Sequence, residues 1–131
     1  MEAAELVAES VLGEFVTVSI GKKVFSIYPP TIKTICKACK HFSKIKLEKE
    51  YNNVNIIGEI PNNINHVING LSCFITEKKL ERWKLRRQMH NMTNKEVKKL
   101  WDEVIPLIDG RDFFDYAFSM KSATEMIAKQ K

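Results

Sequence analysis

Two cysteines and a histidine lie close together in the stretch TICKACKHF, where Cys36, Cys39 and His41 have the spacing C-x-x-C-x-H. Thiolate and imidazole are the ligands that structural zinc sites use, so this stretch is a candidate metal site. It also has helical periodicity, and at about 100° per residue both cysteines fall beside Ile32 and Ile35, whereas His41 falls about 180° from Ile32. Side chains on opposite sides of a helix cannot coordinate the same metal ion. We predict that the cysteines are small buried residues of a helix.

The other residue types that do chemistry do not complete a site. A zinc site would need a second ligand pair, for which only Cys73, His66 and His90 remain. No GxxxxGK[ST], HExxH or GxSxG motif occurs, and no nucleophile, base and orienting group come together. Three aspartates between residues 109 and 115 bracket a helix start, where negative charge is favoured. We predict no catalytic site, no metal site and no cofactor, and hence a protein that is not an enzyme.

The charge of the chain is unevenly distributed. Residues 78–99 contain nine basic and two acidic residues, a local +7 within a net charge of +5, and Trp83 lies among them. Such a region can bind phosphates while the tryptophan stacks on a base, it can bind an acidic protein, or it can be a solvated helix face. No helix-turn-helix or RNA-binding signature supports the first of these.

Length and composition indicate one domain. The chain has 131 residues, of which 44% are hydrophobic, which is enough for a single core. Three cysteines suit a reducing compartment better than a disulfide framework. No apolar run is long enough to span a membrane, and the first residues are acidic where a signal peptide would be basic. We expect a soluble, intracellular protein with no membrane contact.

The N-terminal part predicts a β-hairpin. Residues 1–13 form an acidic segment that resembles a short, frayed helix, and residues 14–30 follow as the hairpin. FVTVSI at 15–20 and VFSIY at 24–28 alternate polar with apolar residues around a Gly-Lys-Lys turn, which places Val16, Val18 and Ile20 on one face. Pro29 and Pro30 end the second strand.

Residues 31–131 are predicted to be mainly helical. Thr31 and Thr93 suit N-caps, and Thr93 forms a capping box with Glu96. Residues 51–58 are Asn-rich and predict a loop, with a short strand at 54–57, before a helix that opens at Pro61. Apolar stripes at 32–42, 64–75, 97–108 and 113–118 would form the core, with Phe113, Phe114 and Phe118 inward. The fold class is therefore α+β, an N-terminal β-hairpin packed on a bundle of about five α-helices.

The order of these segments resembles a known family. A hairpin ending in VFSIYPPTIKTICKACK, a helix pair, a charged stretch and the C-terminal MTNKEVKKLWDEVIPLIDGRDFFDYAFSMKSATEMIAKQ are similar to the small tail assembly chaperones of long-tailed phages and prophages. In that family the hairpin leads into x-Pro-Leu-Thr and a long helix, and a nearly all-helical region ends in aspartate and paired phenylalanines. Pro30 and Thr31 match the first signature, although Ile32 follows Thr31 and Pro29 is not part of the pattern. The resemblance covers about residues 14–127.

The resemblance implies a non-enzymatic protein in the cytoplasm of the bacterial host cell. Such chaperones are thought to coat the tape measure protein until tail tube subunits polymerise around it, which makes a tape measure or tail tube protein the expected partner. A long amphipathic helix exposes apolar seams that a groove can cover reversibly. Two alternatives stay open: a small basic nucleic-acid-binding protein of phage or bacterial origin, and a structural virion component.

The residues that we predict for partner binding lie in the basic region. Trp and Arg are common interface anchors, so the partner-facing set is Leu80, Arg82, Trp83, Arg86 and Arg87. The alternative is that Trp83 is buried and the arginines only keep the domain in solution. The sequence leaves the oligomeric state and the host undetermined.

Overall fold

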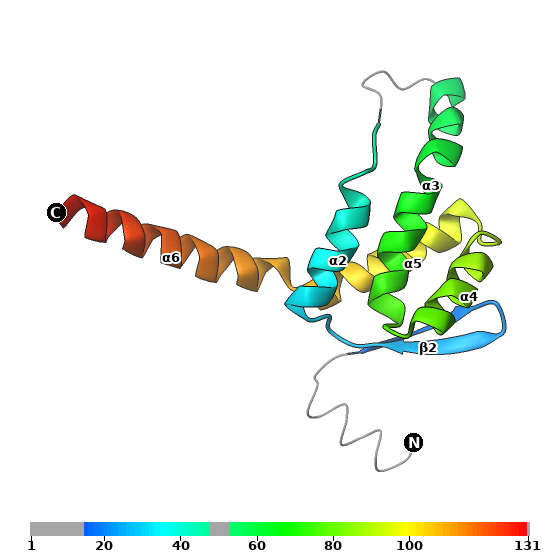
Figure 1. The fold of residues 1–131 in the computed structure, drawn as a ribbon, viewed down its shortest axis with the longest axis horizontal. Coiled ribbons are helices and arrows are strands. Elements are labelled where there is room, and N and C mark those ends of the chain that lie inside the picture. Colours follow the sequence, from blue (N-terminus) through cyan, green and yellow to red (C-terminus); the bar gives the residue numbers. More distant parts are fainter. Residues whose placement is uncertain (1–14, 48–52, 131) are drawn as a thin grey trace, which may run out of the picture.

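A computed structural model describes residues 15–47 and 53–130 of the chain. The elements in chain order are β1 (Val16–Ile20), β2 (Lys23–Ile27), α2 (Ile32–Phe42), α3 (Asn53–Ile75), α4 (Lys79–Met89), α5 (Asn94–Ile108) and α6 (Gly110–Gln130). A two-stranded hairpin followed by five helices confirms the predicted α+β class (Figure 1). The acidic helix predicted within residues 1–13 lies outside the described residues. Among those described, no helix has the length and hydropathy needed to cross a lipid bilayer.

The hairpin has the predicted buried face, but its turn is one residue shorter than predicted: Gly21 and Lys22 form the turn, and Lys23 pairs with Ile20. β1 and β2 are antiparallel, with Val16 opposite Ile27 and Val18 opposite Phe25. Gly21 adopts a positive φ of 63° in the turn, a conformation that costs glycine little. The inward side chains of both strands are buried against the helices, and the hairpin contacts α3, α4 and α5 beneath the bundle (Figure 1). The hairpin therefore closes one end of the helical core.

The helix α3 is longer than the sequence predicted. It begins at Asn53 and continues through Pro61 to Ile75, so the predicted loop, the strand at 54–57 and the helix start at Pro61 are wrong. Proline lacks an amide proton and normally ends a helix. Here the apolar residues before and after Pro61 share helical spacing, but Ile57 and Ile60 are exposed, whereas Ile64 and Val67 pack against the core. The Asn63 side chain donates to the Glu59 carbonyl and so links the turn before the proline to the rest of α3. This extension places Ile60 on the same helix as Ile64 and Val67.

A close contact between α2 and α3 fixes their separation. A Cβ atom added to Gly70 would lie 2.2 Å from Cε1 of Phe42, well inside van der Waals contact. Phe42 ends α2, and its ring stacks on Phe74 of α3 at 6.3 Å between centroids. Only glycine at position 70 lets the phenylalanine ring sit this close to the α3 backbone.

The buried face of α2 differs from the predicted one. Thr34 and Ala38 are buried against α3, whereas Cys36 and Cys39 are exposed, so the prediction that these cysteines are core residues is wrong. The hydroxyl of Thr34 donates to Oε1 of Glu77 at 3.3 Å, and Ala38 allows a close approach, which explains why this polar face packs inward. His41 lies on the half-buried side of α2, opposite to the cysteines.

The helices α4 and α5 form the rest of the body. α5 opens with the predicted capping box, in which the Glu96 amide donates to the Thr93 hydroxyl at 3.2 Å. Leu85 and Met89 of α4 are buried, and so are three residues of α5. In Figure 1, α2, α3 and α4 stand side by side and α5 crosses behind them. The core is therefore shared by the hairpin and four helices.

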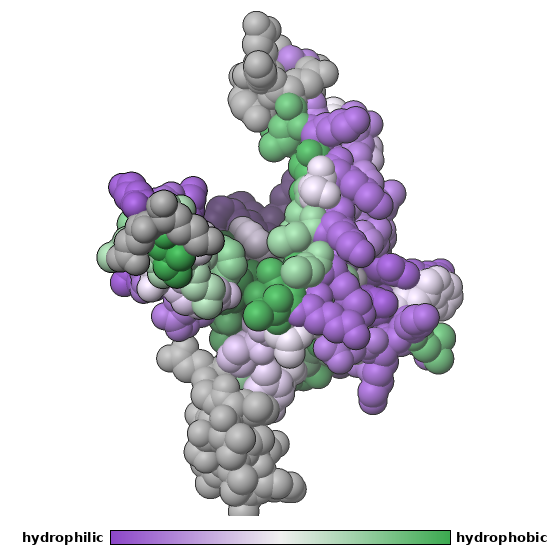
Figure 2. Space-filling view, turned by 60° about the vertical axis from the view of Figure 1, so that its left-hand side comes forward, coloured by the Kyte–Doolittle hydropathy of each residue, from purple (hydrophilic) through white to green (hydrophobic). Residues whose placement is uncertain are grey.

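The last helix, α6, leaves this body. It projects away from the bundle (Figure 1), and none of its residues from 110 to 129 is buried. Phe113, Phe114 and Phe118 are each at least 60% exposed, so the prediction that they point into the core is wrong. A single residue, Asp109, separates α5 from α6, and its left-handed φ of 52° redirects the chain without reversing it. In Figure 2, where α6 points toward the viewer, hydrophobic residues lie on α6 and on the neighbouring side of the body.

Candidate functional site

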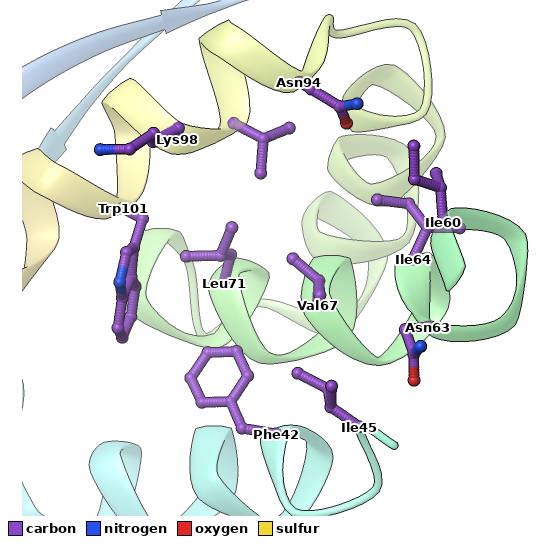
Figure 3. Close-up of a pocket in the computed structure, with 11 residues that line it drawn as sticks. Phe42, Ile45, Ile60, Asn63, Ile64, Val67, Leu71, Asn94, Lys98 and Trp101 are labelled. Atoms are coloured by element: carbon purple, nitrogen blue, oxygen red, sulfur yellow. The ribbon is translucent and has the colours of Figure 1, made fainter. Parts of the chain in front are cut away.

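An apolar groove opens between α2, α3 and α5. It has a volume of about 590 Å³. Its apolar lining consists of Phe42, Ile45, Ile60, Ile64, Val67, Leu71, Val97 and Trp101. Asn63, Asn94 and Lys98 supply the polar atoms at its margins, as Figure 3 shows. A groove with this lining offers hydrophobic contact to a ligand and few directed hydrogen bonds.

Two aromatic rings form one end of the groove. Phe42 of α2 and Trp101 of α5 point into the same space (Figure 3), with ring centroids 5.6 Å apart and an edge-to-face angle of 75°. Phe42 is also held from behind by Phe74 and by the absence of a side chain at Gly70. Trp101 is only half-buried, although it packs against the core. This end is therefore a preformed aromatic surface that remains open to a ligand.

A buried asparagine fixes the opposite end. Asn63 on α3 accepts a hydrogen bond from the Lys46 amide at 2.8 Å and donates one to the Lys46 carbonyl at 2.9 Å. Its amide group also donates to the backbone carbonyl and a carboxylate oxygen of Glu59. These bonds hold the segment after α2 against α3, and they position Ile45 at the wall of the groove.

Among the described residues, three lysines and the carboxylates of Glu59 and Asp102 lie in or beside the groove. Lys44 and Lys46 flank Ile45 in the chain, and Lys98 lines the groove from α5. The Lys98 ammonium pairs with Asp102 at 2.9 Å, but both side chains are more than half exposed, so water screens this pair. Glu59 is the acidic group at the Lys46 end. A ligand with acidic residues beside an apolar stripe would match this margin.

The residues predicted for partner binding divide between two sides of α4. Leu80 is 68% exposed and Trp83 is 49% exposed, so the alternative in which the tryptophan is buried is wrong. The guanidinium carbon of Arg87 lies 5.1 Å from the centroid of the Trp83 ring, a cation–π contact. Arg82 and Arg86 are instead half-buried and contribute positive charge near His41 of α2. Leu80, Trp83 and Arg87 thus form an exposed face of α4 that is separate from the groove.

Burial and these arginines act together on His41. Desolvation, followed by the positive charges of Lys44, Arg82 and Arg86 and of the nearby His66, lowers the pKa of His41 below its ordinary value of 6.5. The imidazole is therefore neutral at pH 7. Within residues 15–47 and 53–130 no group of three or more His, Cys, Asp or Glu side chains is arranged to hold a metal ion.

The stripes predicted to form the core include most of the apolar groove residues, but not Ile45 or Ile60. Their signal is the spacing of Ile60, Ile64, Val67 and Leu71, which places one apolar stripe along α3. This stripe is visible only when Pro61 is treated as an interior helical residue. Since α3 has another apolar face that packs against α2 and the hairpin, sequence alone does not show which face stays open.

In comparisons with known proteins, no family model, curated protein or solved structure matched the chain.

Proposed function

We propose that this protein is a non-enzymatic assembly chaperone that binds an amphipathic helix of another protein. The observation that carries the proposal is the open groove lined by eight apolar side chains between α2, α3 and α5. Helix-in-groove recognition needs a concave apolar surface that accepts side chains at i, i+3, i+4 and i+7 of the ligand. The groove presents such a surface on a rigid frame of three helices.

The specific form of the proposal is a phage tail assembly chaperone that binds the tape measure protein. The resemblance of residues 14–127 to that family supports this form. A tape measure protein is a long helix with apolar seams, and covering those seams prevents aggregation before the tail tube forms. The exposed face of Leu80, Trp83 and Arg87 on α4 supplies a second contact surface for the same partner.

The proposal is tested by capturing partners from the native cell with tagged protein after nuclease treatment. We expect a long, helix-rich tail protein in near-stoichiometric amount. Ile60→Glu introduces a charge into the groove and should abolish capture, because burying an unpaired carboxylate is unfavourable. The matched control is Ile57→Glu, on the same helix and 66% exposed, which does not line the groove. Equal capture by both variants would contradict the groove as the site.

The exposed tryptophan of α4 favours one alternative function. Trp83 with Arg87 above its ring, among the basic residues of α4, is also suited to stacking on a nucleic-acid base. Binding of this kind weakens steeply as salt rises, because lysine and arginine contacts release counterions from the phosphates. Capture that disappears on nuclease treatment, with no protein retained, would favour the nucleic-acid function. A structural virion component would instead remain in purified particles, from which a chaperone should be missing.

A further inference from the structure

The helix α6 presents an apolar stripe that none of the described residues, 15–47 and 53–130, covers. At about 100° per residue, six residues fall on one side of α6. They are Phe113, Tyr116, Ala117, Met120, Ala123 and Ile127. The four large side chains among them are between 43% and 65% exposed. Phe113 and Tyr116 contact each other edge-to-face at 5.3 Å, which orders the aromatic half of the stripe. Exposure of this much contiguous apolar surface indicates an interaction site.

We propose that two copies of the chain exchange α6, so that the apolar stripe of each α6 lies in the groove between α2, α3 and α5 of the other copy. Among the described residues, the stripe of α6 is a convex apolar surface and the groove is a concave one, and both are open. Reciprocal exchange satisfies both surfaces in each copy and closes the assembly as a two-fold dimer. The inference rests on the proposed function only in that it uses the same groove for a helix.

The short joint between α5 and α6 prevents α6 from lying in the groove of its own chain. Two antiparallel helices are connected by about 2–5 loop residues, but only Asp109 lies between Ile108 and Gly110. The groove uses the first half of α5, from Asn94 to Trp101, which is about 12–22 Å of helix away from the joint. To reach it, α6 would have to reverse its direction, and Figure 1 shows it leaving the body instead. An α6 helix that lies in the groove must therefore belong to a second molecule.

One charged contact fits the exchange. At about 100° per residue, Asp112 lies at the edge of the stripe, whereas Asp115 lies on the far side of α6. Lys98 lines the groove, and Lys44 and Lys46 line the neighbouring pocket that shares Asn63 with it. A hydrogen bond with Asp109 and the charges of Asp109 and Asp115 raise the pKa of Asp112. A lysine of the second copy beside Asp112 would favour its charged form.

The area is sufficient for a stable dimer only when the exchange is reciprocal. Each large aromatic side chain can bury about 150–250 Å², so one helix in one groove buries on the order of 1,000 Å² from both surfaces, near the lower limit for specific complexes. Two such contacts bury roughly 2,000 Å², the range of stable dimers. This argument favours a closed pair over a single docked helix.

The first test is the molar mass of the purified full chain, measured by light scattering across a micromolar concentration series. We expect a dimer. Met120→Glu on the stripe and Ile60→Glu in the groove should each weaken dimerisation at least about tenfold, because each would bury a carboxylate. The matched controls are Met126→Glu, equally exposed but outside the stripe, and Ile57→Glu, outside the groove. Both controls should remain dimeric.

A mixture of the two disruptive variants tests the exchange itself. Met120→Glu keeps an intact groove and Ile60→Glu keeps an intact stripe, so the mixture retains one of the two contacts and should form heterodimers more readily than either variant alone forms homodimers. Loss of the dimer in Met120→Glu but not in Ile60→Glu would show that α6 pairs with α6, and would overturn the proposal. A monomer at all concentrations would also overturn it.

The same variants separate this inference from the proposed function. A wild-type monomer that still captures its partner through the groove would overturn the exchange and leave the function standing. A dimer that depends on both surfaces but captures no partner would overturn the function and leave the exchange standing. If both the exchange and the proposed function are correct, α6 and the partner compete for the groove. The monomeric Met120→Glu variant should then capture more partner than the wild type.

Discussion

Two successive helices of this protein use similar amphipathic patterns in opposite ways. α5 buries Leu100, Val104 and Leu107 in the core, whereas α6 leaves Phe113, Met120 and Ile127 exposed. The two helices are joined by one residue, so the difference arises from direction rather than from composition. The comparison shows that an apolar stripe indicates a helix face that is buried in a contact, but does not identify whether the contact is with its own chain or with another molecule.

The sharpest test of this contrast compares one truncation in each helix. Leu100→Ala should lower the free energy of unfolding by about 2–5 kcal/mol, because it removes a buried side chain and leaves a cavity. Phe118→Ala, at a residue 64% exposed, should change it by less than about 0.5 kcal/mol. Urea unfolding at low protein concentration, followed by circular dichroism, measures both. Equal losses of unfolding free energy in the two variants would mean that α6 packs on the body as α5 does.

A second pair compares packed and unpacked positions within α3. Gly70→Ala would force Phe42 to move and should lower the free energy of unfolding by about 1–3 kcal/mol. Gly58→Ala, with nothing within 4 Å of the added Cβ, should raise it by about 0.4–1 kcal/mol, because alanine favours helix. The two variants should therefore shift the urea midpoint in opposite directions. A gain in both would mean that α2 and α3 are not in close contact.

The cap of α5 tests whether this helix folds with the body. Thr93→Ala removes the hydroxyl that accepts from the Glu96 amide and should lower the free energy of unfolding by about 1 kcal/mol. Thr93→Ser keeps the hydroxyl and should stay close to the wild type. Thermal unfolding of the three proteins measures the effect, and an unchanged midpoint in Thr93→Ala would show that α5 frays independently.

The smallest expected effect is the pH dependence due to His41. Because the folded pKa of His41 is lowered, the unfolded chain takes up a proton first as the pH falls below about 6.5, and the fold loses stability from there down to the folded pKa. His41→Gln cannot ionise and should show a smaller loss of melting temperature between about pH 7.5 and 5.5. Slopes that coincide would assign the pH dependence to other groups.

Local sequence signals predicted the parts of the fold that local interactions determine. The hairpin and its buried face follow from the alternation of polar and apolar residues on either side of Gly21, and the starts of α2 and α5 follow from the hydroxyls of Thr31 and Thr93. The exposure of α6 could not be predicted in this way, because its stripe has the same periodicity as that of a core helix. The one-residue joint at Asp109 is what separates an exposed α6 from a core helix. Its effect on the direction of α6 can be worked out only when the position of α5 is known.

The candidate site was predicted less well, for two physical reasons. The groove depends on Ile60 and Ile64 sharing a helix, which the helix-breaking tendency of Pro61 concealed. The face of α2 that packs inward was predicted from hydropathy, but the close approach of helices selected Thr34 and Ala38 over Cys36 and Cys39. On α4, the spacing of Leu80, Trp83 and Arg87 correctly grouped three residues that share an exposed face.

The contact of Phe42 with Gly70 has a consequence for the ancestry of this fold. Since a side chain at position 70 would displace the ring of Phe42, substitutions at the two positions are coupled. Descendants of a common ancestor should retain glycine wherever the aromatic residue is kept, and should lose both together. This pair would act as a marker in diverged genomes, where the exposed residues of α6 change along with whatever they bind.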